Sequence, residues 1–343
     1  MLALVVVCAP PMLSSDLYRQ AAYGRMVAHH HLNPYATPVN AIPHDPAFAL
    51  ANHPHLTTHY GPAYTLLSAL LAALAPSTAL GLAVAWKAAA ACGALACAFM
   101  VAPLARALDG AESDGRNAQL WVAWNPLLVI ESAVSAHPEP IMMFAALAGI
   151  LVWQRGRPAR GAIVLVVSTL TKWITGLVLV FAIVREAAQA RPATAGRRLR
   201  VLLALGAAAG LTAALLYLPF IRGLAARGGI SDLAMRGSAT VGSRPLNPMP
   251  QWASLAGFAV LVLAALRFVA RGGWPRLIAT ATALTLVFIT LVNPWPFPWY
   301  FLTPFILVAT LPPSGAAFFL RALTAGIAAL SLLLMYTRLI PWP

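Results

Sequence analysis

The sequence predicts an all-α polytopic membrane protein with about 9–11 transmembrane or half-membrane helices. Apolar residues make up 60% of the 343 residues and charged residues only 9%, whereas a soluble domain carries about 25% charged residues. The mean hydropathy is +0.77. The 23 Gly and 28 Pro residues suit membrane helices, because neighbouring helices satisfy the backbone groups that they leave free. A soluble fold, a disordered chain and a coiled coil are excluded.

Apolar segments follow one another along most of the chain, so we expect residues 1–343 to form one integral membrane domain without a repeat. Helices are expected over 62–76, 79–105, 119–136, 140–153, 161–184, 201–221, 251–269, 276–292, 301–312 and 315–337. Several of these segments are too short to cross a bilayer unless they are tilted or paired. Their proline boundaries indicate broken helices that line a cavity, since irregular backbone is tolerated at that depth only there.

Residues 2–13 are apolar but lack a preceding basic stretch, so they do not resemble a signal peptide. At ~1.5 Å per residue the segment reaches only about 18 Å into a ~30 Å hydrocarbon core. We interpret it as a partial helix or, preferably, as the end of a first membrane helix that the start of the chain truncates.

The net charge is +14, from 23 basic and 9 acidic residues. Because the basic residues lie between apolar segments, as orientation signals do, we expect the lipid bilayer as a partner and no nucleic acid. Most arginines fall on the cytoplasmic side if that side holds 106–118, 154–160, 185–200, 270–276 and 313–321. The polar loops 14–60 and 222–250 then face the periplasm or the exterior. Residues 161–184, with arginines at both ends, predict two short helices broken near Thr171–Lys172–Trp173.

Asp16 follows the first apolar segment directly and is the first candidate for catalysis. A carboxylate near apolar surface at a membrane boundary is expected to have a raised proton affinity, which suits a general base. The structural alternative is that Asp16 caps a helix that starts at Leu17, since Asp is a favoured N-cap. From its position alone, capping is the stronger interpretation.

A second candidate is the run His137-Pro138-Glu139-Pro140, at the outer junction of two short segments. Its prolines stop one helix and start the next, which would present His137 and Glu139 to an outer cavity. The alternative is a polar turn in which the helix dipole favours Glu139. The two interpretations are evenly matched.

Charges inside apolar segments are costly and usually pair or line a wet cavity. Lys87 and Glu131 lie at similar depth, so we expect them to pair. Lys172 has no obvious acidic partner in the sequence, which favours snorkelling or contact with a lipid phosphate. The outer loop 222–250 carries four further cations that suit the phosphate of a lipid, because arginine binds phosphate through a planar fork of donors; they are Arg222, Arg227, Arg236 and Arg244. The alternative is a solvated loop.

The histidines of the first loop have spacings that resemble metal sites only weakly. His29, His30 and His31 are adjacent, so they point about 100° apart on a helix, and the second group, His53, His55 and His59, lacks cysteine partners. No metal site is expected. Late in the chain, residues 293–300 combine aromatic residues with prolines; they form either an interfacial belt or a rigid rim that contacts a sugar ring or a prenyl chain.

Several short motifs resemble the bacterial polyprenyl-phosphate-sugar-dependent glycosyltransferases of the GT-C fold, in particular the α-mannosyltransferase-like branch. The first outer loop carries Ser15-Asp16-Leu17-Tyr18-Arg19, Gly24-Arg25, Asn33-Pro34-Tyr35 and Tyr60-Gly61-Pro62 in the family's order. Weaker similarities are His137-x-Glu139, Lys172 and Pro298-Trp299-Tyr300. The chain departs from the family in its incomplete first helix and in His-Pro-Glu, where the family often has His-Asn-Asp.

The resemblance implies an inverting transfer of a sugar, mannose by preference, from a polyprenyl phosphate to a hydroxyl of a glycan or lipid acceptor. It places the enzyme in the bacterial plasma membrane with its site facing outward. Asp16 would be the base, and Lys172 with the four arginines of 222–250 would bind the donor phosphate. It further implies that substrate is bound by Tyr18, Arg19, Arg25, Asn33, Tyr35, Tyr60, His137, Glu139, Trp299 and Tyr300. No cofactor is expected, since a phosphomonoester leaving group needs no divalent ion as strongly as a diphosphate.

Two other functions fit the same sequence. A transporter or flippase of a lipid-linked or cationic solute would use Lys87, Glu131 and Lys172 as a charge pathway, although no repeated halves are visible. A non-catalytic relative of the glycosyltransferases is the third interpretation. The sequence leaves the sugar, the acceptor and the oligomeric state open.

Overall fold

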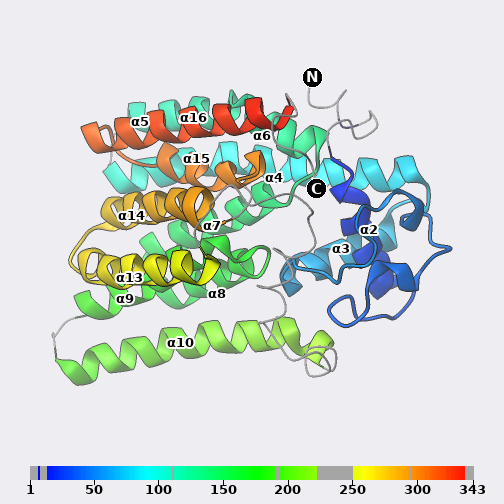
Figure 1. Cartoon of the computed structure of the whole chain (residues 1–343). Helices are drawn as coiled ribbons and strands as arrows, with labels where there is room; N and C mark the ends of the chain where they lie inside the picture. Colours follow the sequence, from blue (N-terminus) through cyan, green and yellow to red (C-terminus); the bar gives the residue numbers. More distant parts are fainter. Residues whose placement is uncertain are drawn as a thin grey trace.

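The computed structural model describes Val7 and residues 14–109, 112–190, 194–221, 250–293 and 296–336. These residues form helices and connecting loops, and no strand occurs among them. Figure 1 shows most helices lying side by side in a bundle, with α2 and α3 grouped beyond one end of it. The all-α prediction is therefore confirmed.

Within the described part of the chain, five helices are long and apolar enough to cross a membrane. They are Ala79–Leu108 within α4 (Ala79–Asp109), Ala195–Phe220 (α10, Ala195–Tyr217, with η5, Leu218–Phe220), α13 (Gln251–Ala270), Trp274–Val292 (α14, Trp274–Val287, with η6, Phe288–Val292) and Gly315–Leu334 within α16 (Gly315–Tyr336). On α10 and α13, most of the span's residues are not buried inside the protein, as expected of helices whose apolar side chains contact lipid. The chain is a multi-pass membrane protein.

A sixth span is bent. Its first arm is α6 (Pro126–Val129) with the π-helical turn η3 (Ile130–Val134), and its second is α7 (Glu139–Gln154); the two meet at 117°. Before it lies α5 (Glu112–Ala123). The prolines Pro126 and Pro140 stand in the first turn of each arm, where a missing N–H costs no helical hydrogen bond. The expected stop and restart around Pro138 is confirmed.

The expected hairpin within 161–184 is also confirmed. The helix α8 (Pro158–Thr169) ends just before Lys172, and the chain then passes through η4 (Trp173–Thr175) into α9 (Gly176–Gln189). At the far end of this hairpin, Trp153 Nε1 of α7 donates to Glu186 Oε2 of α9 at 3.0 Å. The ends of α7 and α9 therefore lie together at one end of the bundle, while Lys172 lies at the other end.

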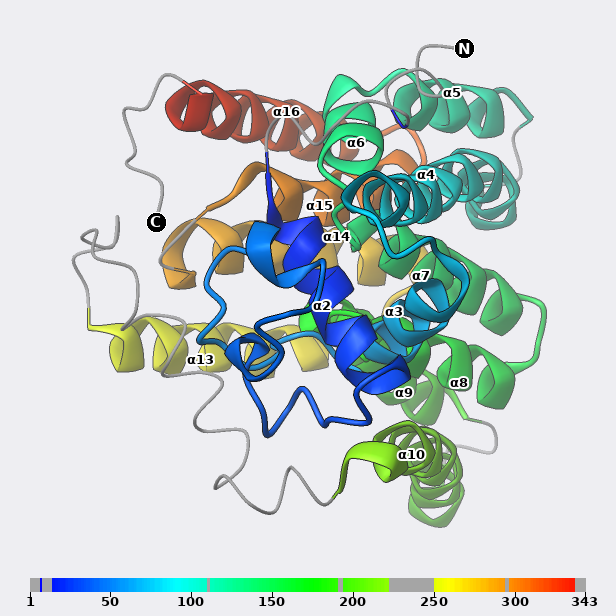
Figure 2. The same cartoon turned by 90° about the vertical axis from the view of Figure 1, so that its right-hand side faces the viewer.

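The first polar loop and its neighbours form a separate cap over one end of the bundle, seen face-on in Figure 2. It consists of α2 (Asp16–Ala28), η1 (Val39–Ala41), η2 (Phe48–Leu50) and α3 (Pro62–Leu74). Its apolar core joins α2, α3 and the first part of α4, and includes Leu17, Tyr23 and Trp86. A Cβ on Gly24 would lie 2.2 Å from Ser68 O, so α2 and α3 approach as closely as they do only because residue 24 is glycine.

The start of α3 is docked onto the break between α8 and α9. Gly61 N donates to Thr171 O at 3.3 Å and Ala63 N donates to Leu170 O at 3.0 Å. A Cβ on Gly61 would lie 2.0 Å from Leu170 O. This contact joins the cap to the bundle at the break that contains Lys172. Later in the chain come η7 (Pro298–Phe301) and α15 (Leu302–Ala309). Both pack into the main core of the bundle.

Candidate active site

Asp16 is the first residue of α2 rather than its cap. Ser15 occupies the N-cap position without a side-chain cap bond, so the expectation that Asp16 caps a helix starting at Leu17 is wrong. Its carboxylate instead binds two donors through the same oxygen: Arg19 Nη2 at 3.1 Å and Asn52 Nδ2 at 2.6 Å both reach Oδ1. Among the described residues, no donor binds Oδ2. Because the side chain keeps 13% of its accessible surface, Oδ2 is the atom of Asp16 that remains open to a substrate.

The proton affinity of Asp16 is lowered, not raised as its position beside the membrane suggests. Burial raises the pKa of the carboxyl, but the Arg19 guanidinium, His137 and the Asn52 amide outweigh this effect and bring the pKa to about 2. An opposite charge and hydrogen bonds to the charged form both favour ionisation. Asp16 is therefore a carboxylate at any physiological pH.

His59 stands beside Asp16 on the open side of the site. The surrounding protein and the cations Arg19 and Lys172 lower the pKa of His59 below its ordinary value, against the opposing effect of Asp16. Its ring also packs against Tyr60, with centroids 4.2 Å apart, and part of the side chain is exposed to solvent. His59 is thus a neutral imidazole at the site.

His137 and Glu139 come to the site from the sharp bend between the arms of the broken span. Ala136 has a φ of 58°, a conformation that costs energy for a residue with a Cβ and that clusters at functional sites. The turn is held by a hydrogen bond from His137 N to Glu131 O at 2.8 Å. Both side chains are buried, so they line the inner wall of the site and not a solvated outer rim.

Glu139 is the acidic partner of Lys172. Glu139 Oε1 accepts a hydrogen bond from Lys172 Nζ, which also lies over the ring of Tyr300, 4.4 Å from its centroid. The expectation that Lys172 lacks an acidic partner is wrong, because the partner lies 33 residues away in sequence and reaches it only through the fold. Glu139 Oε2 is buried and makes no hydrogen bond with any residue that the structure describes.

The structure pairs Glu131 with His137 instead of Lys87. His137 Nε2 and Glu131 Oε2 lie 3.4 Å apart, although their geometry is not that of a hydrogen bond. Among the ion pairs of the described residues, Lys87 and Glu131 do not meet, so the expected pairing is wrong. Both side chains are buried.

Trp299 lies between two other rings. His137 stacks on one face, with centroids 4.0 Å apart and planes at 18°, and Phe297 stacks on the other at 4.5 Å and 12°. Both faces of the indole are therefore covered by protein, which leaves no face of Trp299 for a sugar ring. Trp299 and Phe297 together support His137 from behind.

Tyrosines connect the cap to this centre. Gln20 Nε2 donates to Tyr60 Oη at 3.2 Å, and Gln20 Oε1 accepts from Tyr64 Oη. Gln20 lies one turn after Asp16 on α2, so this buried pair of bonds sets the position of α2 against α3. Tyr18 is buried in the apolar core of the cap.

Three residues of the predicted substrate set make structural contacts, two of them within the cap and one with η5. Arg25 Nε donates to both oxygens of Asp45 at 2.8 Å. Asn33 Nδ2 donates to Phe220 O at 2.9 Å, and Tyr35 Oη donates to Tyr60 O at 2.8 Å. These contacts shape the loop that carries Asn52 and His59. Their assignment to substrate binding stays a prediction, and Arg222, Arg227, Arg236 and Arg244 lie outside the described residues.

Asn52, His59 and Gln20 were not selected as site residues from the sequence. No local motif marks Asn52 or Gln20, and His59 was considered only as a metal ligand. Among the described residues, no group of three His, Cys, Asp or Glu side chains is placed to share a metal ion. These residues join the site only because the loop folds back over the start of α2.

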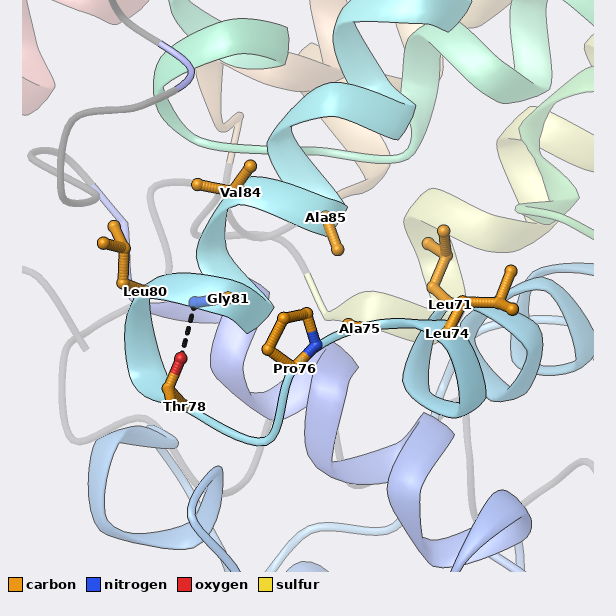
Figure 3. Close-up of a pocket in the computed structure, with 9 residues that line it drawn as sticks. All are labelled: Leu71, Leu74, Ala75, Pro76, Thr78, Leu80, Gly81, Val84 and Ala85. Carbon is orange, nitrogen blue, oxygen red and sulfur yellow. Dashed lines mark hydrogen bonds between the residues drawn. The ribbon is translucent and has the colours of Figure 1, made fainter.

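A pocket of about 510 Å³ lies elsewhere, between the end of α3 and the start of α4. Its lining, drawn in Figure 3, is Leu71, Leu74, Ala75, Pro76, Thr78, Leu80, Gly81, Val84 and Ala85. The hydrogen bond drawn there runs from Gly81 N to Thr78 Oγ1 at 3.1 Å. The lining contains no titratable side chain, so this pocket offers no acid or base.

The fold and the site together define a class: a multi-pass, all-α membrane protein with a polar cap. The cap carries the Asp16 carboxylate, of which Oδ1 accepts two hydrogen bonds, near the buried side chains of Lys172 and His137. A family model described as alpha-(1->6)-mannopyranosyltransferase, N-terminal domain, matches residues 3–188. The chain belongs to this family of GT-C mannosyltransferases, as its first-loop motifs suggest, and is a glycosyltransferase. The matched range contains Asp16, Asn52, His137 and Lys172. No curated protein was found to match the chain.

Proposed function

We propose that the protein transfers mannose, with inversion, from a polyprenyl-phosphate donor to a hydroxyl of a glycan or lipid acceptor at the outer face of a bacterial plasma membrane. The observation that carries the proposal is that only one of the two Asp16 carboxylate oxygens accepts hydrogen bonds from the described residues. Arg19 and Asn52 both hold Oδ1, and Oδ2 is left for the acceptor. The family's description names an α-linkage, so an inverting transfer requires a donor of β configuration.

In the proposed reaction the acceptor oxygen attacks the anomeric carbon while the bond from that carbon to the phosphate oxygen breaks. The hydroxyl proton passes to Asp16 Oδ2, and the electron pair of the broken bond stays on the phosphate. A pKa of about 2 makes Asp16 a weak base, so proton transfer comes late, when the attacking hydroxyl has become acidic. A fixed negative charge also stabilises the positive charge that develops on the sugar.

Among the described residues, Lys172 is our candidate for a cation that faces the leaving phosphate. Its own charge is balanced by Glu139, and Arg19 is balanced by Asp16. A phosphate that approaches Lys172 therefore competes with Glu139, and further cations are needed to bind it firmly. The arginines of 222–250 are our candidates for that role.

The outward orientation rests on the distribution of arginines between the two sides of the membrane. It also fits a prenyl-phosphate donor, whose tail stays in the bilayer while its sugar enters the site from the side. Labelling of single cysteines introduced at His44 and at Arg155 with an impermeant maleimide tests the orientation. We expect reaction in intact cells at position 44 alone; reaction at 155 alone contradicts the proposal.

The test of function is mannose transfer by the purified, full-length protein with a radiolabelled polyprenyl-phosphate mannose in mixed micelles. We expect Asp16→Asn to lower kcat by at least ~10³-fold, since it removes both the base and the negative charge. The matched control is Glu186→Gln, which alters a carboxylate at the opposite end of the bundle and should leave transfer unchanged. Full activity of Asp16→Asn contradicts the mechanism, and lipid translocation without transfer by the wild-type protein favours a flippase instead.

A further inference from the structure

We propose that Asn52 is a positioning residue, which holds the Asp16 carboxylate with one oxygen bound and the other turned toward the acceptor hydroxyl. The catalytic consequence rests on the proposed function. The orientation of the carboxylate does not, because it depends only on contacts that this chain makes with itself.

The geometry around Asp16 carries the inference. Asn52 Nδ2 donates to Oδ1 at 2.6 Å, the shorter of the two bonds that this oxygen accepts. A carboxylate has no proton to donate at neutral pH, so the amide must present its NH2 group and not its oxygen. With two planar donors on one oxygen, rotation of the carboxylate breaks both bonds. The position of Oδ2 is thereby fixed, although none of the described residues donates a hydrogen bond to it.

Arg19 and Asn52 both donate to Asp16, but only Asn52 positions it relative to the rest of the cap. Arg19 lies one turn along α2 from Asp16, so its bond moves with the helix and does not place the helix. Asn52 lies 36 residues away in sequence, in the loop between η2 and α3. Its bond fixes Asp16 relative to the part of the cap that also carries His59.

The local backbone supports a specific placement of Asn52. Ala51 N donates to Phe48 O at 3.1 Å before it, and Leu56 N donates to His53 O at 3.0 Å after it. His53 has a φ of 48°, which costs energy for a residue with a Cβ. Asn52 Oδ1 is buried and accepts no hydrogen bond from the described residues, which also costs energy. The loop tolerates both costs and gains one charge-assisted bond to Asp16.

Other charged and titratable groups surround Asp16, and a pH effect must be separated from them. By element they are Arg19 and Tyr23 on α2; His53, His59 and Tyr60 in the loop; Tyr64 on α3; Glu131, His137 and Glu139 at the bend; and Lys172 and Tyr300. Variants at Asn52 leave all of these groups in place. A change in the titration of Asp16 in such variants therefore reports the Asn52 contact itself.

The first experiment compares Asn52→Ala with the wild type in the full-length protein. Loss of the donor destabilises the charged form, so the pKa of Asp16 rises. Carbodiimide labels only protonated carboxyl groups, and mass spectrometry of the peptide that contains Asp16 gives the rate of labelling from pH 3 to pH 7. In this range the rate follows the small protonated fraction of Asp16, so a rise of about one unit in its pKa should make labelling about 10-fold faster at a given pH. We also expect kcat to fall ~10-fold or more with KM within about 2-fold, because only orientation is lost.

Asn52→Asp and Asn40→Ala complete the design. Asn52→Asp has the same shape, so it keeps the test valid even if Asn52→Ala fails to fold. Two adjacent carboxylates share a proton, so the labelling rate of Asp16 at a given pH should rise further than in Asn52→Ala. Asn40 is exposed and lies in η1 of the same cap, and Asn40→Ala should behave as the wild type in both measurements.

An unchanged labelling curve in both Asn52 variants overturns the inference, as does unchanged kcat in an active enzyme. If the curves shift while the wild type transfers no mannose, Asn52 still positions Asp16 and the proposed function fails alone. If the wild type transfers mannose and the curves do not shift, the proposed function stands and this inference fails.

Discussion

The imidazole of His137 lies flat against the indole of Trp299, with centroids 4.0 Å apart and planes at 18°. The two residues are 162 positions apart in sequence and belong to different parts of the bundle: the bend of the broken span and η7. Because Phe297 covers the opposite face of Trp299, His137 has a rigid wall behind it. The buried side of the site is therefore built from aromatic rings.

Replacing Trp299 tests this wall. We expect Trp299→Leu to lower kcat by about 10-fold and the free energy of unfolding by about 3 kcal/mol, since it removes both stacks and leaves a cavity. Trp299→Phe retains a ring and should lose less in both measurements. Thermal unfolding and mannose transfer measured on the same samples provide the check. Equal effects of Leu and Phe contradict a stacking role.

Replacing Gly61 tests the contact between the cap and the bundle. A Cβ at this position lies 2.0 Å from Leu170 O, a backbone atom, so Gly61→Ala must shift α3 away from the break beside Lys172. We expect a loss of about 3 kcal/mol in the free energy of unfolding and a clear loss of transfer. In the control, Gly206→Ala on α10, the added Cβ meets no atom within 4 Å and stability should be unchanged or slightly raised.

Replacing Lys172 and Glu139 singly and together tests their buried ion pair. Lys172→Met and Glu139→Gln each leave one partner behind, so each should cost about 3–5 kcal/mol in the free energy of unfolding. The double variant should cost clearly less than the sum of the two, because no unpaired charge remains. Denaturant unfolding in detergent measures this coupling. Additive costs show that the two residues do not depend on each other.

The pH dependence of transfer tests the state of Asp16. Because the pKa of this carboxyl is held at about 2, we expect no loss of kcat/KM on the acid side down to about pH 4. The folded pKa lies below the ordinary value of 3.8, so ionised Asp16 contributes stability above that value and loses it as the pH falls toward 2. An acid limb near pH 6 that disappears in Asp16→Asn contradicts the assigned state.

The burial of the charged site residues shows why their partners escaped prediction. Lys172 was expected to contact a lipid phosphate, yet it donates a hydrogen bond to Glu139, which lies 33 residues away in sequence. Glu131 was expected to meet Lys87 at the same depth, yet the bend turns His137 toward it. Depth along a helix follows from counting residues, whereas the face and the neighbour of a side chain depend on how a break reorients the next helix.

The sequence alone determined the membrane class, the order and breaks of the helices, and the family, because apolar length, proline positions and short motifs are local properties of the chain. Only the tertiary structure decided that Asn52 and Arg19 share one oxygen of Asp16 and leave the other free. That arrangement depends on the long loop closing over α2, and loop closure is set by distant contacts such as Gly61 with Leu170. Contacts between residues so far apart in the sequence cannot be read from a local pattern of residues.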